Sequence, residues 1–379
     1  MIERISAHFG APDEAAFEGL ALDAFAYQFE RIPAYRAMCE RNAKTPSTVA
    51  SWRDVPMIPA AAFATVDLAT EAPLETFRSS GTLGDNRSVH RHPFPDLYRA
   101  AVDASFPRFC LRGFSEAARE ASERVPEASA GMPASIPARI PASLPAPIPM
   151  LALVPPRAIA PDSSLGFMVD HLLQRFGGPG SDYAFGERGV EGAKSRSWFG
   201  ARQREGRPVM LLGTSFALAD LLDFLARIDL KFRLPSGSVV FETGGFKGRA
   251  RELSREDLHR RLAEQLFVTA ESIVGEYGMT ELTSQCYTET LAGGDPELFV
   301  PPHWMKVRAL DPVTLQELPA GTTGLLAFFD LANVGSALHL LTEDLGAIEG
   351  TGFRLAGRAP DSDLRGCSLL AEELGSAAR

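Results

Sequence analysis

The sequence predicts an α/β fold in which sheets are flanked by helices. Two observations lead to this prediction: short apolar runs typical of buried strands recur along the chain, and turn residues and stretches of helical periodicity follow them. Strands that alternate with helices favour sheets covered by helices. In such folds binding sites gather where strands end and loops begin, so functional residues are expected in the loops between these runs.

Two helical stretches are predicted before residue 115. Residues 13–42 start at Asp13, a residue type that caps helix N-termini, and Pro33 is expected to break or bend the run. Apolar side chains recur every four residues on one face of this stretch, at Phe17, Ala21, Phe25 and Phe29. Residues 93–112 predict a second helix. The side chains along one stripe of it are Leu97, Ala101, Ser105 and Phe109.

Residues 115–149 differ in composition from the rest of the chain. They consist largely of Ala, Ser, Pro, Glu and Arg, with prolines at positions 126, 133, 137, 141, 145, 147 and 149. Proline blocks both helices and central strands, and the segment lacks the apolar bulk of a core. We interpret it as an inserted, mobile surface loop with partial polyproline II character. The alternative is a docking segment for a partner.

From residue 150 onwards, apolar runs alternate with helical patterns. The runs that predict strands are 150–154, 209–213, 238–242, 272–274, 324–329 and 339–342. A helical pattern follows the second run and continues through Leu230. Another helix is expected to start at Ser254, because Ser254-Arg255-Glu256-Asp257 resembles a capping box.

The overall composition excludes some classes of protein. The 379 residues carry a net charge of -10, which argues against wrapping DNA or RNA, because affinity for phosphates comes largely from Lys and Arg. No stretch approaches the ~20 apolar residues of a membrane span. The N-terminus lacks the apolar run of a signal peptide. A cytoplasmic protein with neither nucleic-acid partner nor membrane span is therefore expected.

The cysteines show no pattern of a metal or disulfide framework. The four are Cys39, Cys110, Cys286 and Cys367. None forms a CxxC pair, and no Cys/His spacing resembles a zinc site. Most of them are expected to be reduced, buried thiols.

A run of small residues at positions 79–84 predicts a loop that binds phosphate. Such a run can turn several N–H groups and hydroxyls toward an anion. The residues expected to act are Ser79, Ser80, Gly81, Thr82 and Gly84. Arg87, Ser88, His90, Arg91 and His92 follow closely and add positive charge and hydrogen-bond donors. No Gly-Lys-Ser/Thr follows, so this is not a Walker A loop, and a Gly-rich surface turn is the alternative.

A second glycine-rich loop follows the strand predicted at 238–242. Gly244 and Gly245 allow a flat base to approach the backbone closely. Lys247 lies two residues further and can reach a phosphate or a carboxylate. The alternative is a loop with an exposed lysine.

The segment from Glu276 to Glu281 joins a predicted strand to a tight turn. Tyr277 offers a face for stacking, Gly278 forms the turn, and Thr280 offers a hydroxyl. Glu281 is a hard oxygen ligand of the kind that Mg²⁺ prefers together with phosphate oxygens. The alternative is a strand–turn–helix junction with Glu281 in the first helical turn, where the helix dipole favours it.

Two polar positions follow the last predicted strand. Asp344 is expected at the end of that strand, where its carboxylate can accept both hydroxyls of a ribose. Gly357-Arg358 follows Leu345 by twelve residues. The alternative is a hairpin with polar turn residues.

Cys367 lies near the C-terminus, in a tail that is expected to be mobile. Arg365 favours the thiolate over the thiol, whereas Glu372 and Glu373 oppose it. Cys367 is therefore a candidate nucleophile.

Read in order, these motifs resemble the adenylate-forming superfamily of acyl-CoA synthetases, luciferase-type enzymes and peptide-synthetase adenylation domains. Residues 79–84 match its phosphate loop, Gly244-Gly245 its adenine-contacting glycines, and 277–281 its Tyr-Gly-x-Thr-Glu segment. Asp344 matches its ribose-binding aspartate, and Gly357-Arg358 matches the pair before its hinge.

Within the superfamily, the chain is most similar to the LuxE-like acyl-protein synthetases of bacterial luminescence. The matches that carry this similarity are Ser80-Gly81-Thr82 with the Arg-Ser-x-His run at 87–90, Gly244-Gly245-Phe246-Lys247, 277–281, and Gly357-Arg358-Ala359 with Arg365-Gly366-Cys367-Ser368-Leu369. It covers roughly residues 25–112 and 150–375 and leaves out the Pro-rich insert.

The resemblance implies a large N-terminal domain with stacked sheets flanked by helices. This domain would span residues 1–360, and the usual C-terminal subdomain would be reduced to a short tail, 361–379. That subdomain normally carries a catalytic lysine, and Lys247 is our candidate to replace it. In the phosphate loop of the superfamily the commoner sequence is Thr-Thr-Gly. This chain has Thr82-Leu83-Gly84 instead and so lacks one hydroxyl.

The resemblance also implies ATP and Mg²⁺ as cofactors. Glu281 would hold the metal, Thr280 a phosphate oxygen, and the loop at 79–84 the β and γ phosphates. A carboxylic acid, expected to be fatty, would become an acyl-adenylate. Cys367 would then take the acyl group as a thioester and pass it to a partner reductase or another acyl acceptor, with the tail swinging about residues 358–363.

Two other functions share part of this pattern. An acyl-CoA ligase of the phenylacetate type would use every nucleotide motif but transfer the acyl group to free CoA instead of Cys367. A non-catalytic relative would act as a scaffold through the Pro-rich insert, although Glu281, Asp344 and Arg358 argue against decay of the site.

Overall fold

The computed structural model describes residues 1–79, 87–112, 114, 147–244, 254–360, 370 and 373–376. Most of the Pro-rich insert, up to residue 146, therefore lies outside the described residues. In the part of the chain that is described, no helix is long and apolar enough to cross a bilayer.

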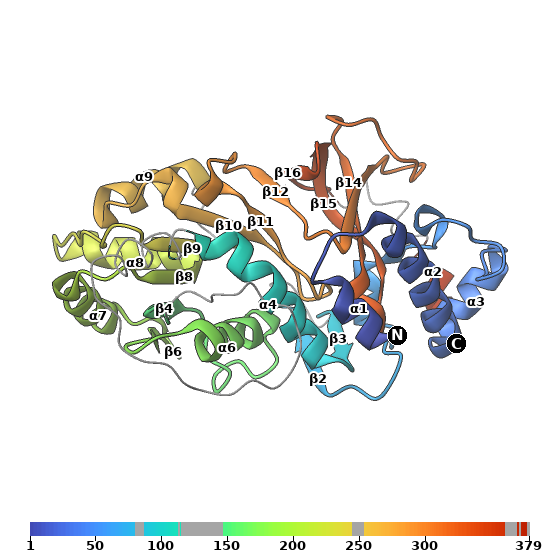
Figure 1. Cartoon of the computed structure of the whole chain (residues 1–379), viewed down its shortest axis with the longest axis horizontal. Coiled ribbons are helices and arrows are strands. Elements are labelled where there is room, and N and C mark those ends of the chain that lie inside the picture. The colour runs from blue at the N-terminus through green and yellow to red at the C-terminus, as the bar shows by residue number, and fades with distance from the viewer. Residues whose placement is uncertain are drawn as a thin grey trace.

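One large mixed sheet forms the centre of the molecule (Figure 1). Its strands are β1 (Ile58–Pro59), β4 (Met150–Leu153), β5 (Asp182–Tyr183), β8 (Met210–Thr214), β9 (Val239–Thr243), β10 (Ile273–Tyr277), β11 (Cys286–Thr288), β12 (Leu298–Val300), β13 (Met305–Leu310), β14 (Gly324–Asp330), β15 (His339–Glu349) and β16 (Gly352–Arg358). They are hydrogen-bonded in the order β13-β14-β15-β16-β12-β11-β10-β9-β8-β4-β5, and β1 pairs with β15. Two short hairpins, β2 (Glu75–Arg78) with β3 (Val89–His92) and β6 (Phe185–Gly186) with β7 (Gly189–Val190), lie outside this order.

The sheet has a parallel half and an antiparallel half. Strands β5, β4, β8, β9 and β10 run parallel to their neighbours. From β10 through β11, β12, β16, β15 and β14 to β13 all pairings are antiparallel. The carboxyl ends of β9 and β10, where the predicted motifs follow, therefore lie where the two halves meet.

Helices cover both faces of the parallel half. On one face, α7 (Gly192–Glu205), α8 (Ser215–Arg227) and α9 (Arg255–Leu266) share an apolar core with Leu151 and Leu153. On the other face, α4 (Pro95–Cys110) and α6 (Ser164–Phe176) pack on Met150 and Ala152. Because both faces are buried, β4 is apolar at successive positions instead of alternating. In Figure 1, α7, α8 and α9 lie at the left of the molecule, and α4 and α6 lie nearer its centre.

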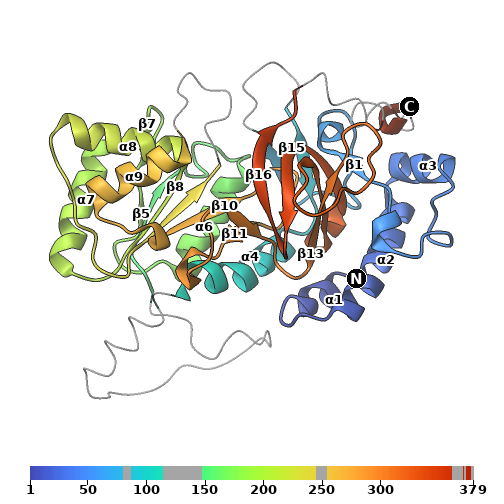
Figure 2. The ribbon, with the colours of Figure 1, turned by 90° about the horizontal axis from the view of Figure 1, so that it is seen from above.

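The N-terminal helices pack against the antiparallel half. They are α1 (Ile2–His8), α2 (Glu14–Arg31) and α3 (Pro33–Arg41), and they share a core with β14 and β15. Asp13 caps α2 by accepting a hydrogen bond from the Ala16 N–H at 3.0 Å, and Pro33 starts α3, as predicted. Seen from above in Figure 2, these helices and α7–α9 lie at opposite ends of the molecule.

The predicted α/β class with helices flanking the sheet is confirmed. Every predicted strand and helix in the described residues forms, with ends shifted by a few residues. One feature differs from the expected stacked sheets. The parallel and antiparallel halves form a single continuous sheet, in which ten successive strand pairings lead from β13 to β5. The join runs through β11 and β12, two three-residue strands with no strong sequence signal.

Candidate functional site

The structure describes about half of the predicted site residues. The predicted residues that it describes are Ser79, Gly244, Tyr277, Gly278, Thr280, Glu281, Asp344 and Arg358. The predicted residues that lie outside the described part of the chain are Ser80, Gly81, Thr82, Gly84, Gly245, Lys247 and Cys367. The site is therefore built from the first group and its neighbours.

Three of the predicted residues meet around the Asp344 carboxylate. The hydroxyl of Tyr277, the last residue of β10, donates to Asp344 Oδ2 at 2.9 Å. Arg358 Nε donates to Asp344 Oδ1 at 3.3 Å from the opposite position on β16. Burial, and then the negative charge of Asp344, raise the pKa of Tyr277 well above its usual value. The tyrosine is therefore a neutral hydrogen-bond donor at this carboxylate.

The expected position of Asp344 at the end of a strand is wrong. β15 continues five residues beyond it, to Glu349, and Asp344 is buried. The polar residues from Thr342 to Asp344 suggested a strand end. The strand nevertheless continues, because Asp344 and the residues after it pair with β16, with a register shift at Leu345/Gly346. The hairpin turn lies after Glu349 instead.

The ring of Tyr277 belongs to the apolar core beneath this carboxylate. It stacks on Phe328 with ring centroids 5.3 Å apart and an interplanar angle of 18°, and Phe353 meets it edge-on. Only 6% of the residue is exposed. Phe328 therefore already occupies one face of the Tyr277 ring, so a nucleotide base could stack only on the other face.

Glu281 lies against the base of the predicted phosphate loop. Ser79 and Ser88 hold the two ends of that loop together through Ser79 N–H to Ser88 O at 3.1 Å and Ser88 N–H to Ser79 Oγ at 3.0 Å. Burial raises the pKa of Glu281, while a hydrogen bond from the Ser88 side chain and the charge of Arg358 lower it. The Glu281 carboxylate therefore interacts with Ser88, at one end of the predicted phosphate loop, and with the charge of Arg358, which binds Asp344.

The backbone after Tyr277 does not continue into a helix. Residues 278–285 form turns that lead into the antiparallel strand β11. The alternative that placed Glu281 in the first turn of a helix is therefore wrong. Side-chain contacts orient these turns, because Asn333 Nδ2 donates to the Glu281 carbonyl at 2.9 Å.

Two buried histidines of β3 face the same turns. His90 Nδ1 donates to the Thr280 carbonyl at 2.7 Å, so its Nε2 carries the lone pair. Thr283 donates its hydroxyl proton to Asn333 at 2.7 Å and therefore accepts from His92 Nε2 at 2.9 Å. These tautomers are assigned from the hydrogen-bond network. Burial lowers the pKa of His90 to about 4 and that of His92 well below its usual value, so both rings are neutral at pH 7.

Several buried polar atoms near these rings have no hydrogen-bond partner among the described residues. They are His90 Nε2, His92 Nδ1 and Gln285 Oε1. Unpaired buried polar atoms are uncommon because each costs about 1–3 kcal/mol. They lie on the side of β10 that faces α4, where Gln285 Nε2 donates to the Tyr98 hydroxyl at 3.2 Å. The positive charge expected from His90 and His92 is wrong, because burial keeps both rings neutral. The unpaired polar atoms around them were not anticipated from the sequence.

Glu276 is a second residue that sequence reasoning missed. It directly precedes Tyr277, and its carboxylate accepts a hydrogen bond from the Thr243 hydroxyl at the end of β9. Burial raises its pKa to about 7. A Cβ at Gly278 would collide with Oε1 of this carboxylate, so a larger residue there would require the Glu276 side chain to shift. The available signal was its position at a strand end, one residue before the Tyr-Gly turn.

Glu242, the third missed residue, ties both ends of the loop that contains Gly245 and Lys247. Its buried carboxylate accepts hydrogen bonds from Ser215 Oγ at 2.7 Å, Arg255 Nε at 3.0 Å and His259 Nε2 at 2.8 Å. Ser215 Oγ also lies 2.6 Å from the Gly244 carbonyl. The ends of the loop at 244 and 255 are thus held by one carboxylate. Although burial raises the pKa of Glu242, the hydrogen bond from His259 and the charge of Arg255 outweigh it and lower the pKa.

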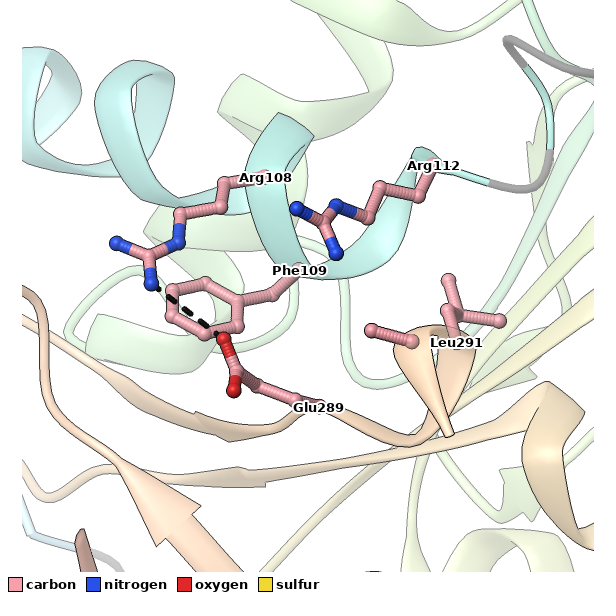
Figure 3. Close-up of a pocket in the computed structure, with 6 residues that line it drawn as sticks. Arg108, Phe109, Arg112, Glu289 and Leu291 are labelled. Atoms are coloured by element: carbon pink, nitrogen blue, oxygen red, sulfur yellow. Dashed lines mark hydrogen bonds and ion pairs between the residues drawn. The ribbon is translucent and has the colours of Figure 1, made fainter. Parts of the chain in front are cut away.

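A surface depression between α4 and the turn Thr290–Ala292 lies apart from these residues (Figure 3). Arg108 pairs with Glu289 across it at 3.4 Å. No predicted site residue lines it, and it has no internal space for a water molecule. We therefore assign it no ligand.

The described residues can accommodate Mg²⁺ if phosphate completes its coordination. They contain no group of three or more His, Cys, Asp or Glu side chains that could hold a metal ion alone. Mg²⁺ is commonly bound through one or two carboxylates plus substrate phosphates. Glu281 fits this role, and Glu343 is close enough for its charge to raise the pKa of Glu281.

Three of the cysteines are buried, reduced thiols, as predicted for most of them. They are Cys39, Cys110 and Cys286. Burial raises the pKa of Cys39 to about 12 and those of Cys110 and Cys286 well above their usual value. These thiols are therefore poor nucleophiles at neutral pH.

Residues 197–374 match the family model described as acyl-protein synthetase, LuxE. The match includes the segments around Gly244, Tyr277, Asp344 and Cys367 but not the loop at 79–84. Among curated proteins, the chain is similar to the long-chain-fatty-acid–luciferin-component ligase of Vibrio harveyi, with 26% identity over 176 residues. That alignment covers 44% of this chain and 45% of the relative.

The ligase of the same name from Aliivibrio fischeri is 23% identical over 145 residues, covering 38% of this chain and 37% of that protein. The matched region thus spans less than half the length of either relative. Among solved structures, 2-hydroxyisobutyryl-CoA ligase in complex with 2-HIB-AMP and CoA aligns with a TM-score of 0.62 at 15% identity. The alignment covers 92% of this chain and 75% of that one, so the two chains share a fold.

Proposed function

Because residues 197–374 match the LuxE acyl-protein synthetase family, we propose that the chain activates a carboxylic acid with ATP and then carries the acyl group on Cys367. The single observation that carries this proposal is the meeting of Tyr277, Asp344 and Arg358. The names of the curated relatives support a long-chain fatty acid as the substrate class.

In the first step, a carboxylate oxygen of the acid attacks the α-phosphorus of ATP. The bond from that phosphorus to the pyrophosphate oxygen breaks, and acyl-adenylate and pyrophosphate form. Ser79 and the small residues after it would bind the β and γ phosphates, and Thr280 a phosphate oxygen. Asp344 would accept the ribose hydroxyls. Positioned donors of this kind lower the barrier because they match the charge that develops on phosphoryl oxygens.

The nucleotide base would lie between Tyr277 and the glycines at 244–245. Mg²⁺, held by Glu281, would neutralise phosphate charge when bound. Lys247 would pair with the acid's carboxylate or the α-phosphate. If Lys247→Ala releases pyrophosphate at the wild-type rate, this role for Lys247 is wrong.

In the second step, the Cys367 sulfur attacks the acyl carbonyl carbon. A C–S bond forms, the bond from that carbon to the phosphate oxygen breaks, AMP leaves, and the thiol proton passes to solvent. The other three cysteines do not fit this role, because they are buried with raised pKa values. The thioester would then pass to a partner, such as a thioester reductase.

The test is the intact mass of the protein after incubation with Mg-ATP and a panel of carboxylic acids, for wild type and Cys367→Ser. We expect an acyl adduct on wild type that is absent in the variant, with pyrophosphate released by both. Pyrophosphate release without an adduct, together with acyl-CoA when CoA is added, would identify a CoA ligase instead. Absence of ATP binding by calorimetry would leave the scaffold function.

A further inference from the structure

Alternate residues along β3 contact the turn that follows β10. The side chains of His90 and His92 both face inward, because every second residue of a strand lies on the same face. His90 Nδ1 donates to the Thr280 carbonyl at 2.7 Å. Two residues before His90, the Ser88 side chain donates a hydrogen bond to the Glu281 carboxylate. One face of this short segment thus holds both residues that the proposed function places at the phosphates.

His92 reaches the same turn through two further side chains. His92 Nε2 donates to Thr283 Oγ1 at 2.9 Å, and the Thr283 hydroxyl donates to Asn333 Oδ1 at 2.7 Å. Asn333 Nδ2 in turn donates to the Glu281 carbonyl at 2.9 Å. This carbonyl directly follows the one that His90 holds. Two successive peptide groups of the turn are therefore fixed by hydrogen bonds that start on β3.

Aromatic rings hold the two histidines in place. Phe63 meets the His90 ring edge-on, with ring centroids 5.2 Å apart. Tyr98 meets the His92 ring edge-on, with centroids 6.0 Å apart. Phe77, from the partner strand β2, lies against both imidazoles, at 6.3 and 6.0 Å between centroids. Side chains whose rotamers are locked by packing position a neighbouring group more precisely than mobile side chains do.

The two imidazoles do not reach a ligand themselves. His90 is 0% exposed and His92 2%, whereas Thr280 is partly exposed. His90 Nε2 and His92 Nδ1 are buried and have no partner among the described residues. Unpaired buried polar atoms lower stability, and an apolar ring of similar size would avoid this loss. Stability therefore does not account for histidine at these two positions, whereas the bonds to the turn do.

Ser88 connects this turn with the predicted phosphate loop. Its N–H donates to Ser79 Oγ at 3.0 Å, and its carbonyl accepts from the Ser79 N–H at 3.1 Å. Its side chain binds Glu281, the candidate Mg²⁺ ligand. Among the described strands, β2 and β3 pair only with each other, so side chains connect this hairpin to the turn.

We propose that Ser88, His90 and His92 are positioning residues that hold Thr280 and Glu281 in the geometry that adenylation requires. The inference rests on the proposed function, because it concerns the attack of the acid's carboxylate on the α-phosphorus. It does not depend on which thiol later receives the acyl group. A misplacement of reacting groups by about 1 Å can slow a reaction on the order of 100-fold, so loss of these contacts should lower the rate.

The experiment compares substitutions that keep or remove one hydrogen-bond donor. His90→Phe keeps a ring but removes the bond to Thr280, whereas His90→Asn keeps an N–H donor close to the position of Nδ1. His92→Phe and His92→Gln form the corresponding pair, because the glutamine amide nitrogen takes the place of Nε2. His303→Phe is the matched control, since His303 Nε2 donates to the His8 carbonyl at the same distance of 2.7 Å, next to α1.

Each full-chain variant is assayed with Mg-ATP and the acid that works best with wild type. Pyrophosphate release gives kcat and KM for ATP, and urea unfolding gives stability. Hydrogen exchange over residues 278–285 of the unliganded protein reports how firmly the turn is held.

We expect His90→Phe to lower kcat roughly 10- to 100-fold, with KM for ATP within about threefold of wild type, because the turn acts on charge that develops in the transition state. His92→Phe should lower kcat less, since it acts through two further side chains. His90→Asn and His92→Gln should recover most of the rate. Exchange in the turn should be faster in both Phe variants, and the unfolding midpoint of His90→Phe should not fall below that of His303→Phe.

Ser88→Ala should raise the Mg²⁺ concentration that gives half the maximal rate. Partners of a metal-binding side chain typically change metal affinity or activity about 10- to 100-fold, and an increase in that range is expected. Exchange in the turn should also become faster. Ser88→Thr keeps the hydroxyl and should resemble wild type in both measurements.

Equal losses of kcat in His90→Phe and His303→Phe would overturn the positioning role, and so would a loss that His90→Asn does not reverse. Unchanged hydrogen exchange over residues 278–285 would contradict it as well. If wild type releases no pyrophosphate with any acid, the proposed function fails and the inference fails with it, which is recognised from wild type alone. Adduct formation plays no part in this test, so a failure of the thioester step is distinguished from a failure of the inference.

Discussion

At the scale of single residues, the carboxyl end of β10 directs two ionisable groups to opposite faces of the sheet. Tyr277 enters the core beneath Asp344, whereas Glu276 faces Thr243. Adjacent residues of a strand point to opposite faces, so this division follows from the strand itself. The two neighbours consequently have separate roles to test, one in nucleotide binding and one in stability.

Asp344→Asn should weaken ATP binding. The amide keeps the shape of the side chain but loses the charge that pairs with Arg358 and would accept ribose hydroxyls. Because charged hydrogen bonds contribute about 1.5–3 kcal/mol, KM for ATP should rise roughly 10- to 100-fold in a pyrophosphate-release assay. Glu349→Gln, an exposed position at the far end of the same strand, is the control. Equal effects of both substitutions would contradict a ribose-binding role.

Glu276 should make the protein less stable as pH rises. Its pKa is about 7 in the folded protein, above the 4.5 of an ordinary glutamate, so the folded state binds the proton more tightly than the unfolded chain does. The stabilisation is complete below pH 4.5 and is lost as pH rises to about 7. The loss is on the order of 3 kcal/mol.

Glu276→Gln cannot titrate, so its stability should exceed that of wild type above pH 7, and the difference should shrink as pH falls toward 4.5. Urea unfolding from about pH 5 to 8 measures this difference. Asp330, whose pKa burial raises to about 6, is present in both proteins and cancels in the comparison. A difference that does not vary with pH would show that Glu276 is ionised throughout.

At the scale of elements, β9 and α9 are linked by a carboxylate that holds the loop between them. Ser215 of α8 binds both Glu242 and the Gly244 carbonyl at the start of that loop, and Arg255 of α9 binds Glu242 at its end. His259 adds a third donor from the next turn of α9. A loop that is tied at its base loses fewer conformations when it binds a ligand, which makes this network relevant to nucleotide affinity.

Glu242→Gln should therefore raise KM for ATP as well as reduce stability by about 3–5 kcal/mol, because it removes the charge that compensates Arg255. Asp223→Asn removes the partner of Arg261, also between α8 and α9, and is the control for a lost ion pair. Both quantities come from urea unfolding and from pyrophosphate release. If the two substitutions raise KM equally, the effect does not come from the loop.

At the scale of the whole molecule, the Pro-rich insert starts and ends in one apolar core. Phe114, which directly precedes it, and Ile148, near its end, are both buried in the cluster that contains α4, α6 and β4. The insert thus joins two positions that the core already holds. Its removal should leave the arrangement of sheet and helices unchanged.

Replacement of residues 115–146 by a Gly/Ser linker of about twelve residues should change the melting temperature by less than a few degrees, since loop-closure entropy varies slowly with length. Pyrophosphate release should also remain within twofold of wild type. A large fall in melting temperature would show that the insert contributes to the core. Normal adenylation with impaired delivery to an acceptor protein would favour the docking alternative.

Local sequence signals predicted the elements well. The cap at Asp13, the break at Pro33 and the start of α9 at Ser254 each depend on residues within four positions, and all three are present. The position of Asp344 was mispredicted because its strand is completed by pairing with β16. A local polar run cannot reveal such a partner.

The sequence by itself determined the α/β class, the order of the elements and the residue types that point to a nucleotide, because these depend on periodicity and short motifs. Only the tertiary structure decided which side chains meet. His90 binds a carbonyl 190 positions away, Tyr277 meets Asp344 across 67 positions, and the last turn of the chain lies on α3. Such contacts depend on strand order and on burial, which fix geometry and raise or lower pKa values only once the chain has folded.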